Sequence, residues 1–324
     1  MTAPRVASGR ASDARSRLFT FLDRRAGRLE SRSHAAAGRI AAPTARLLAA
    51  YRSALSRDEW RAAIVSEIRP HPILAYLHED PFSSHGFRKP RGYEGDAVLL
   101  DFVYGGGASS VWVENATPLG AALYRECVRH PSFAALRARR DYLGVELAAS
   151  CAAARRPEIL SVACGHLREA TVLHGKRSDA LPGRLVALDQ DPETLATAQA
   201  DHASLPLDAR QISVLALLRG DQQLGQFDFI YSAGLYDYLS DDTARRLTRQ
   251  LTDMLKPGGR LLTANMLPDL PAAAYMEAVM DWWLIYRTLA EFETLSLDLG
   301  PGYRVASHTG PYVGYVNIEK ERAR

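Results

Sequence analysis

Residues 159–169 read ILSVACGHLRE, and residues 184–192 read RLVALDQDP. Each is a short apolar run that ends in polar or turn-forming residues, which is typical of a buried strand in a parallel sheet. Gly165 predicts a tight turn into a helix, which leaves backbone N–H groups at the carboxyl end of the first strand. Asp189 follows the second strand, 24 residues after Gly165, where a carboxylate can accept both hydroxyls of a ribose. The two stretches together predict a nucleoside site in an α/β domain.

The chain after residue 156 continues this alternation of short apolar runs and helical patterns. Further strands are expected at 210–214, 227–231 and 260–264, with a terminal antiparallel hairpin at 303–308 and 312–318. Helices are expected at 166–175, 192–201, 240–255 and 271–289. Asp191 and Ser240 are expected to cap the helices that they precede. The pattern indicates a mostly parallel sheet that is covered on both faces.

The first 155 residues have a different texture and are mostly helical. Residues 1–16 are polar, basic and rich in Ala and Ser, and we expect a flexible tail there. Apolar residues recur at helical spacing between 17 and 69, and further helices are expected at 97–104, 117–129 and 133–154. The expected organisation is thus a tail at 1–16, a helical cap or lid domain at 17–155 and a nucleoside-binding domain at 156–324.

The composition bounds the class of protein. The chain has 324 residues, of which 47% are hydrophobic, so it can bury a sizeable core and is not generally disordered. No run approaches the roughly 20 apolar residues of a membrane-spanning helix, and residues 1–30 lack the apolar core of a secretory signal. Three cysteines are too few and too scattered for a disulfide framework or a zinc site. We therefore expect a cytoplasmic protein with no membrane span and no metal.

The small net charge of +3 hides an asymmetry. Residues 1–70 hold 14 Arg and 6 acidic residues, whereas residues 71–324 hold 26 basic and 31 acidic residues. A basic segment can bind nucleic acid. Only four lysines occur in the whole chain, however, so the arginine excess indicates a GC-rich coding bias. We do not expect nucleic acid as a partner.

Two further stretches complete a pattern. Residues 227–239 read FDFIYSAGLYDYL, and residues 255–262 read LKPGGRLL. With the glycine turn and Asp189, they resemble the class I S-adenosylmethionine-dependent methyltransferases over about 157–320. The resemblance implies a Rossmann-like sheet of seven strands, mostly parallel with a terminal antiparallel hairpin, and S-adenosyl-L-methionine as the cofactor.

The resemblance also implies which residues bind the cofactor. They are the turn after the first strand, the end of the second and the end of the fourth: Ala163, Cys164, Gly165, His166, Glu169, Asp189, Gln190, Ser232, Ala233 and Gly234. Ala163 and Leu167 stand where the family usually has glycine. Because Leu167 is larger, we expect Arg168 or Glu169 to hold the amino-acid end of the cofactor.

A narrower resemblance extends over roughly 75–320. The strings at 163–169 and 231–239, with KPRGYEGD at 89–96 and DWWLIYR at 281–287, are similar to the bacterial methyltransferases of 3-hydroxypalmitic acid methyl ester (extracellular factor) synthesis. This implies carboxyl O-methylation of a small molecule, a hydroxy fatty acid or a specialised metabolite.

A carboxylate acceptor is already an anion, so methyl transfer to it needs orientation but no strong base. Arg and Tyr donors are suited to aim it. The predicted substrate-orienting residues are Tyr93, Asp96, Tyr236, Arg140, Tyr286 and Arg287, with Arg91, Arg139, Tyr142 and Tyr238 as further candidates. Of Tyr236 and Tyr238, one is expected to face the site and the other to lie in the core.

Three alternatives stay open. A neutral hydroxyl or amine acceptor in natural-product biosynthesis would need a base, for which His166 and Asp96 are candidates. The altered glycine turn is also compatible with a protein that binds the cofactor without transferring methyl. In a third alternative the Arg-rich front would clamp a nucleic acid for methylation. The expected partner is a small-molecule substrate, and the front helices could also support a homodimer.

Overall fold

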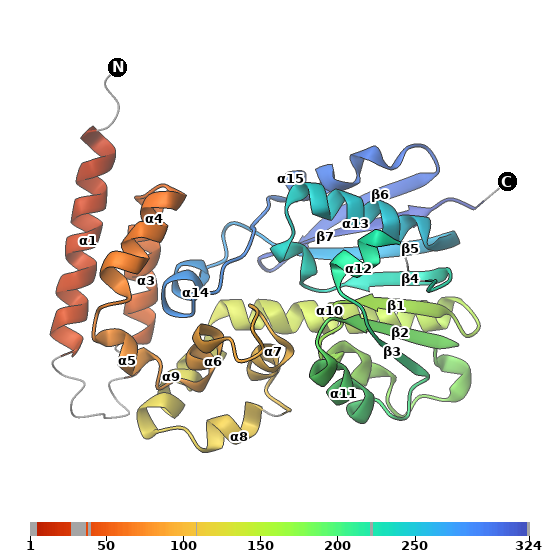
Figure 1. The fold of residues 1–324 in the computed structure, drawn as a ribbon, viewed down its shortest axis with the longest axis horizontal. Helices are drawn as coiled ribbons and strands as arrows, with labels where there is room; N and C mark the ends of the chain where they lie inside the picture. The colour runs from red at the N-terminus through yellow and green to blue at the C-terminus, as the bar shows by residue number, and fades with distance from the viewer. Residues whose placement is uncertain (1–4, 27–36, 38–39, 108, 221–222, 323–324) are drawn as a thin grey trace. The chain divides into compact units, whose positions relative to one another are not determined.

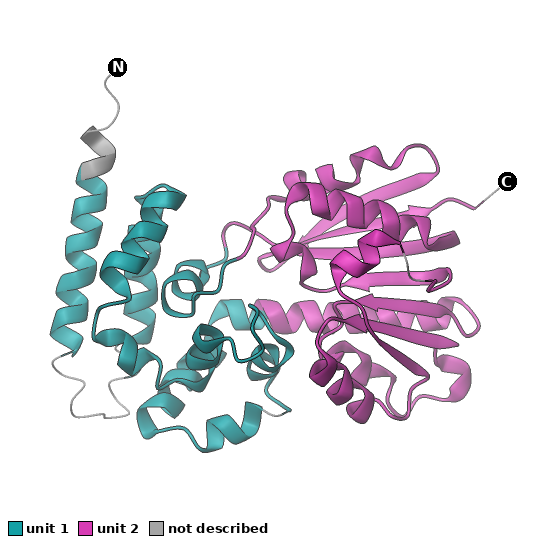
Figure 2. Ribbon diagram, in the orientation of Figure 1, with its two compact units in different colours: residues 1–134, 270–283 teal, residues 135–269, 284–324 magenta. Residues whose placement is uncertain are grey.

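The computed structural model describes residues 5–26, 37, 40–107, 109–220 and 223–322. The chain forms two compact units, residues 1–134 with 270–283 (unit 1) and residues 135–269 with 284–324 (unit 2), as Figure 2 shows. This division differs from the expected domains at 17–155 and 156–324. Helix α10 (Pro131–Ala153) lies mostly in unit 2, and a segment from the second half of the sequence belongs to unit 1.

Unit 1 is helical. Its helices are α1 (Arg5–Ala26), α3 (Ala41–Ser53), α4 (Arg57–Ala63), α5 (Ile73–Leu77), α6 (Pro81–Arg88), α7 (Ala97–Tyr104), α8 (Ser109–Glu114), α9 (Pro118–Arg129) and α14 (Ala273–Val279), with a π-helical turn at Ile64–Ile68. The expectation of a tail is wrong for residues 5–16, which belong to α1. Ala14, Leu18 and Leu22 are buried at four-residue spacing, so one stripe of this polar helix packs inward.

Buried charge anchors the segment 270–283 within unit 1. Glu277 of α14 is almost fully buried. Its carboxylate accepts hydrogen bonds from Arg52 Nε at 2.6 Å and from Trp60 Nε1 at 2.8 Å. A buried carboxylate is tolerated only when it is paired and hydrogen-bonded, so these contacts fix α14 to residues more than 200 positions earlier in the sequence.

Unit 2 is built on one sheet of seven strands. They are β1 (Glu158–Val162), β2 (Arg184–Asp189), β3 (Leu207–Gln211), β4 (Phe227–Ser232), β5 (Leu255–Met266), β6 (Tyr303–Gly310) and β7 (Val313–Lys320). The order is β3-β2-β1-β4-β5-β7-β6, visible in Figure 1. Pairing is parallel from β3 to β5, while β7 is antiparallel to both β5 and β6. The predicted α/β sheet with a terminal antiparallel hairpin is confirmed.

Both faces of the sheet are buried, which explains why its strands are apolar without alternation. On one face, alternate strand residues such as Leu160, Val186 and Ile230 join a core that includes Leu247 and Leu251 of α13 (Asp241–Asp253). On the other face the Arg260 side chain donates to Ser150 Oγ of α10 and lies over the ring of Phe229. Helices α11 (Pro192–Asp201), α12 (Val214–Arg219) and α15 (Leu289–Glu293) complete the unit.

Three sequence-based expectations for local structure are wrong. The third strand ends at Gln211, because Ser213 caps α12. The stretch 166–175 forms only a 3-10 helix at Arg168–Leu173. The helix expected at 271–289 ends at Val279, and Asp281 adopts a left-handed conformation with φ of 50°. Asp191 and Ser240 cap α11 and α13 as predicted.

The described part of the chain bears on membrane spans, disulfides and metal sites. No helix there is long and apolar enough to cross a membrane. Cys127, Cys151 and Cys164 are free thiols. The described residues contain no group of three or more His, Cys, Asp or Glu side chains that could hold a metal ion.

Candidate cofactor and acceptor site

The turn after β1 is left-handed at alternate residues. Ala163, Gly165 and Leu167 have φ of 53°, 55° and 55°. Ala163 and Leu167 thus keep the conformation that glycine adopts most easily, at a cost of roughly 1–2 kcal/mol for each L-residue. Cys164 N–H donates to Leu188 O at 2.9 Å, which ties the turn to β2. The strained turn therefore preserves the shape that a glycine-rich loop would have.

Asp189 closes this turn. Its Oδ2 accepts the backbone N–H of Gly165 at 3.0 Å, and its Oδ1 accepts that of Asp191 at 3.1 Å. The side chain is largely buried, and burial raises its pKa while the backbone N–H donors lower it. Each carboxylate oxygen has a second lone pair, so the same group can also accept two ribose hydroxyls. The donor and acceptor set fits the ribose of S-adenosylmethionine.

Residues of β4 and of the 3-10 helix at Arg168–Leu173, which follows β1, form a second cluster at the same edge of the sheet. The Tyr231 hydroxyl donates to Glu169 Oε1 at 2.7 Å, and Ser232 Oγ donates to Val162 O at 3.0 Å. Burial raises the pKa of Glu169, although Arg139 and Arg140 act in the opposite direction. A carboxylate held in this way is suited to the ammonium of the cofactor's amino-acid end.

Arg139 of α10 lies against the loop that follows β4. A Cβ on Gly234 would lie 3.2 Å from Arg139 Nη1, so the guanidinium packs on the bare backbone of that glycine. Arg139 Nη1 also lies 3.6 Å from Asp237 Oδ2, and both side chains are buried. Asp237 Oδ1 accepts the N–H of Met266 at the end of β5 at 2.7 Å. The ends of β4 and β5 thus meet at a buried guanidinium–carboxylate pair.

Arg287 is not available to orient a substrate, so that prediction is wrong. Its Nε and Nη2 donate to Asp241 Oδ1, its Nη1 to Tyr236 O and Asn265 Oδ1, and its Nη2 also to Leu239 O, over 2.6–3.0 Å. These contacts use all five N–H donors of a guanidinium. Arg287 is instead a positioning residue that fixes the loop after β4.

The other predicted acceptor residues of unit 2 are placed differently. Tyr236 is fully buried in the core, where its hydroxyl contacts Thr248 Oγ1 at 2.9 Å, so it does not line a site. Tyr238 is partly exposed, as expected for one of the pair. Arg140 forms hydrogen bonds with Asp141 through Nε and Nη2. Tyr286 is half-buried beside Arg287.

The remaining predicted cofactor residues cluster around the same strand ends. Cys164 and His166 are buried in the turn, and His202 Nε2 lies 3.2 Å from His166 O. Burial raises the pKa of the Cys164 thiol well above its usual range, which argues against a nucleophile. Gln190 is exposed directly after β2, and Ala233 and Gly234 follow β4.

Tyr93 and Asp96 belong to unit 1. Tyr93 is half-buried in a turn between Gly92 and Gly95, which have φ of 81° and 68°. Asp96 is buried, caps α7 by accepting Leu99 N–H at 2.8 Å, and contacts His85 Nε2. The His85–Asp96 pair leaves no signal in the sequence, because an 11-residue separation across a turn matches no periodic pattern.

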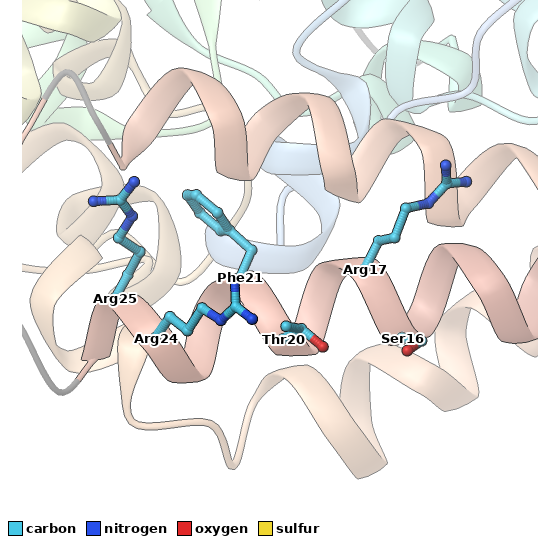
Figure 3. Close-up of a pocket in the computed structure, with 6 residues that line it drawn as sticks. All are labelled: Ser16, Arg17, Thr20, Phe21, Arg24 and Arg25. Atoms are coloured by element: carbon cyan, nitrogen blue, oxygen red, sulfur yellow. The ribbon is translucent and has the colours of Figure 1, made fainter.

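Unit 1 also has a surface hollow of about 400 Å³. It lies on α1 and is lined by Ser16, Arg17, Thr20, Phe21, Arg24 and Arg25, drawn in Figure 3. Arg17 pairs with Asp13 one turn away, and the Arg25 guanidinium lies over the Phe21 ring. The hollow contains none of the predicted site residues.

Comparisons with known proteins agree with this fold. Residues 159–259, from β1 into β5, match the model of a family described as a methyltransferase domain. A solved structure of a possible exported protein from Bordetella parapertussis superposes with a TM-score of 0.55 at 20% identity, covering 83% of this chain and 98% of that one. This likeness shows a shared fold. No curated protein matches the sequence.

Two more distant structures are methyltransferases. Magnesium protoporphyrin IX methyltransferase from Synechocystis PCC 6803 has a TM-score of 0.42 at 12% identity, over 59% of this chain and 84% of that one. The N-methyltransferase NodS from Bradyrhizobium japonicum WM9 has a TM-score of 0.40 at 14% identity, over 57% and 87%.

The domain match coincides with the strand-end site of unit 2. The matched residues include the left-handed turn after β1, the Asp189 side chain that closes this turn, and the loop after β4. The chain therefore contains a match to a methyltransferase domain at residues 159–259, and these three elements of the site lie within it.

Asp189→Asn should weaken cofactor binding about 10- to 100-fold, because an amide NH₂ cannot accept the second backbone N–H. Isothermal titration calorimetry with S-adenosylmethionine measures this Kd. Asp191→Asn is the matched control, since Asn also caps helices, and its Kd should stay near the wild-type value. An unchanged Kd in Asp189→Asn would contradict the ribose assignment.

Arg287→Lys should lower the free energy of unfolding by about 2–4 kcal/mol, because an ammonium cannot satisfy acceptors on so many sides. Urea denaturation followed by circular dichroism measures the change. Arg304→Lys is the control: Arg304 pairs with Glu319 at the surface, so its replacement should cost less than about 1 kcal/mol. Equal effects for the two variants would count against the positioning role.

Burial raises the pKa of Asp237 to about 6, although Arg139 lowers it. A raised pKa means that the folded state binds the proton more tightly than the unfolded chain, so this stability is present below about pH 4 and is lost as the pH rises through about 6. Relative to Asp237→Asn, the wild type should therefore lose about 3 kcal/mol of unfolding free energy over that range. Urea titrations at several pH values measure both proteins. If the wild type and Asp237→Asn lost the same unfolding free energy with rising pH, the raised pKa of Asp237 would be contradicted.

Proposed function

We propose that the methyl acceptor is a small-molecule carboxylate, so that the product is a methyl ester of a hydroxy fatty acid or specialised metabolite. The buried Arg139 guanidinium beside Gly234 carries this proposal. Ligands of open α/β sheets bind at the carboxyl ends of the strands, and a guanidinium there can hold a carboxylate through two N–H groups. The sequence resemblance at 89–96 and 281–287 to the methyltransferases of 3-hydroxypalmitic acid methyl ester synthesis favours the same class of acceptor.

The chain's own residues divide the work under this proposal. Asp189 binds the ribose, Glu169 binds the ammonium of the cofactor, and Arg139 aims the acceptor. The bound cofactor supplies an electrophilic methyl group on a sulfonium. An ionised carboxylate attacks without losing a proton, so orientation and exclusion of water are the main contributions asked of the protein. Tyr93, Arg140 and Tyr286 stay predictions as substrate-orienting residues.

The alternative acceptor is a neutral hydroxyl or amine, which would need a base to take its proton. The predicted cytoplasmic location, small-molecule partner and homodimer apply equally to both candidates.

3-Hydroxypalmitic acid separates the two candidates, because it carries both a carboxylate and a hydroxyl. With S-adenosylmethionine and the full chain, we expect a methyl ester that mild alkali hydrolyses; a methyl ether would resist alkali. Palmitic acid, which has only the carboxylate, and methyl 3-hydroxypalmitate, which has only the hydroxyl, are the matched controls in product analysis by mass spectrometry. Transfer to methyl 3-hydroxypalmitate but not to palmitic acid would replace the first candidate with the second.

A further inference from the structure

The peptide between His166 and Leu167 belongs to the turn after β1, and both of its polar groups are held. Its carbonyl oxygen, that of His166, lies 3.2 Å from Nε2 of His202. Its N–H, that of Leu167, donates to Cys164 O at 3.1 Å. Gly165 and Leu167 both have φ of 55°. The left-handed shape of the turn therefore depends on how this one peptide is oriented.

The hydrogen-bond partners of His202 decide its tautomer. A carbonyl oxygen only accepts, so Nε2 of His202 carries the hydrogen that it donates to His166 O. In the neutral ring Nδ1 then carries the lone pair, and it accepts from Nε2 of His174 at 2.8 Å. His202 is fully buried at the end of α11, whereas His174 is exposed at the end of the 3-10 helix. An exposed histidine thus orients a buried one, and the buried ring holds the turn.

The charge state of the buried ring agrees with this arrangement. Burial lowers the pKa of His202, and the hydrogen bond to the His166 carbonyl offsets part of this effect. Of the charged and titratable neighbours, His174 and Arg168 lower the pKa and Asp201 raises it. A protonated ring has no lone pair and could not accept from His174. The lowered pKa keeps His202 neutral at pH 7, so the ring can make both hydrogen bonds.

Leu167 gives the same peptide a reason to turn over. An L-residue is disfavoured at positive φ, because its Cβ crowds the following carbonyl oxygen. Turning the 166–167 peptide by half a revolution would change φ of Leu167 from 55° to about −125°, which is ordinary extended backbone. The turned peptide would lose its hydrogen bonds to His202 and Cys164. His202 therefore opposes a local relaxation that would change the shape of the turn.

Each left-handed residue of the turn follows a peptide that a side chain from another element holds. Before Ala163, the Val162 carbonyl accepts from Ser232 Oγ at 3.0 Å. Before Gly165, the peptide N–H donates to Asp189 Oδ2 at 3.0 Å. The third left-handed residue follows the peptide that the buried histidine holds. The histidine thus completes a set of three contacts, of which the other two come from the ends of β4 and β2.

We propose that His202 is a positioning residue of the cofactor site, which holds the 166–167 peptide in its strained orientation through the Nε2 hydrogen, and that His174 fixes the tautomer of His202. The inference rests on the proposed use of this turn to bind S-adenosylmethionine. His202 acts through the backbone of the turn, whereas Asp189 both holds the turn and binds the ribose.

The tautomer can be tested without any ligand. ¹⁵N NMR of the histidine rings in the full chain at pH 7 should show His202 with hydrogen on Nε2 and without hydrogen on Nδ1. Hydrogen on Nδ1 alone would overturn the inference, because Nε2 could then not donate to the His166 carbonyl.

His202→Leu should weaken S-adenosylmethionine binding about 10-fold in isothermal titration calorimetry, because the His166 carbonyl loses its donor. His202→Gln should stay within about 3-fold of the wild-type Kd, because its side-chain NH₂ can donate to the same carbonyl. His308→Leu is the control: His308 lies on β6 of unit 2 and stacks on Tyr315, and its Kd should be unchanged. Equal losses in His202→Leu and His202→Gln would contradict the hydrogen bond as the cause.

Leu167→Gly tests the strain. Glycine adopts positive φ about as readily as negative φ, so the turn should no longer need to be held against relaxation. In the Leu167→Gly background, His202→Leu should therefore change the Kd by less than about 3-fold. The loss of the Leu167 side chain is common to both members of this comparison. If His202 had a structural role alone, the two backgrounds would give the same factor, and that result would overturn the inference.

The outcomes separate this inference from the function on which it rests. Failure of the wild type to bind S-adenosylmethionine would overturn both. Wild-type affinity in a folded His202→Leu variant, with weakened binding in Asp189→Asn, would overturn the role of His202 and leave the proposed cofactor site intact.

Discussion

The hydrogen bonds that the Asp189 carboxylate accepts from Gly165 and Asp191 are the contacts on which the cofactor site depends. They join the end of β1 to the end of β2 and to the start of α11. Together with the hydrogen bond from Cys164 N–H to Leu188 O, they support the unfavourable backbone angles of the left-handed turn. The carboxylate oxygens keep lone pairs that can accept ribose hydroxyls, so the side chain that shapes the turn is also suited to bind a ribose.

On the opposite side of β1, Arg287 stabilises the loop after β4 in a comparable way. Removing a guanidinium from water is costly unless its N–H groups are bonded, and here the loop carbonyls, Asn265 and Asp241 satisfy them. The loop that contains Gly234 is thereby fixed, and Arg139 can pack against it. Arg139 is itself buried and lies 3.6 Å from Asp237 Oδ2, so two guanidinium groups stabilise the region after β4.

The identity of the acceptor decides which chemistry the site must supply. A carboxylate needs only alignment with the methyl group, whereas a hydroxyl or an ammonium must lose a proton. Unit 2 provides a buried guanidinium, that of Arg139, at the ends of β4 and β5, which suits the first case.

The sequence by itself determined the alternation of strands and helices, the caps at Asp191 and Ser240, and the pairing of the Gly165 turn with Asp189. These features depend on local signals: apolar runs, turn residues and capping side chains lie within a few positions of one another. Only the tertiary structure decided that Tyr236 is core, that Arg287 is saturated and that residues 270–283 belong to unit 1. It alone also brought His85 to Asp96. Those outcomes depend on which distant groups satisfy a buried hydroxyl, guanidinium or imidazole, and sequence spacing carries no information about partners that only folding brings together.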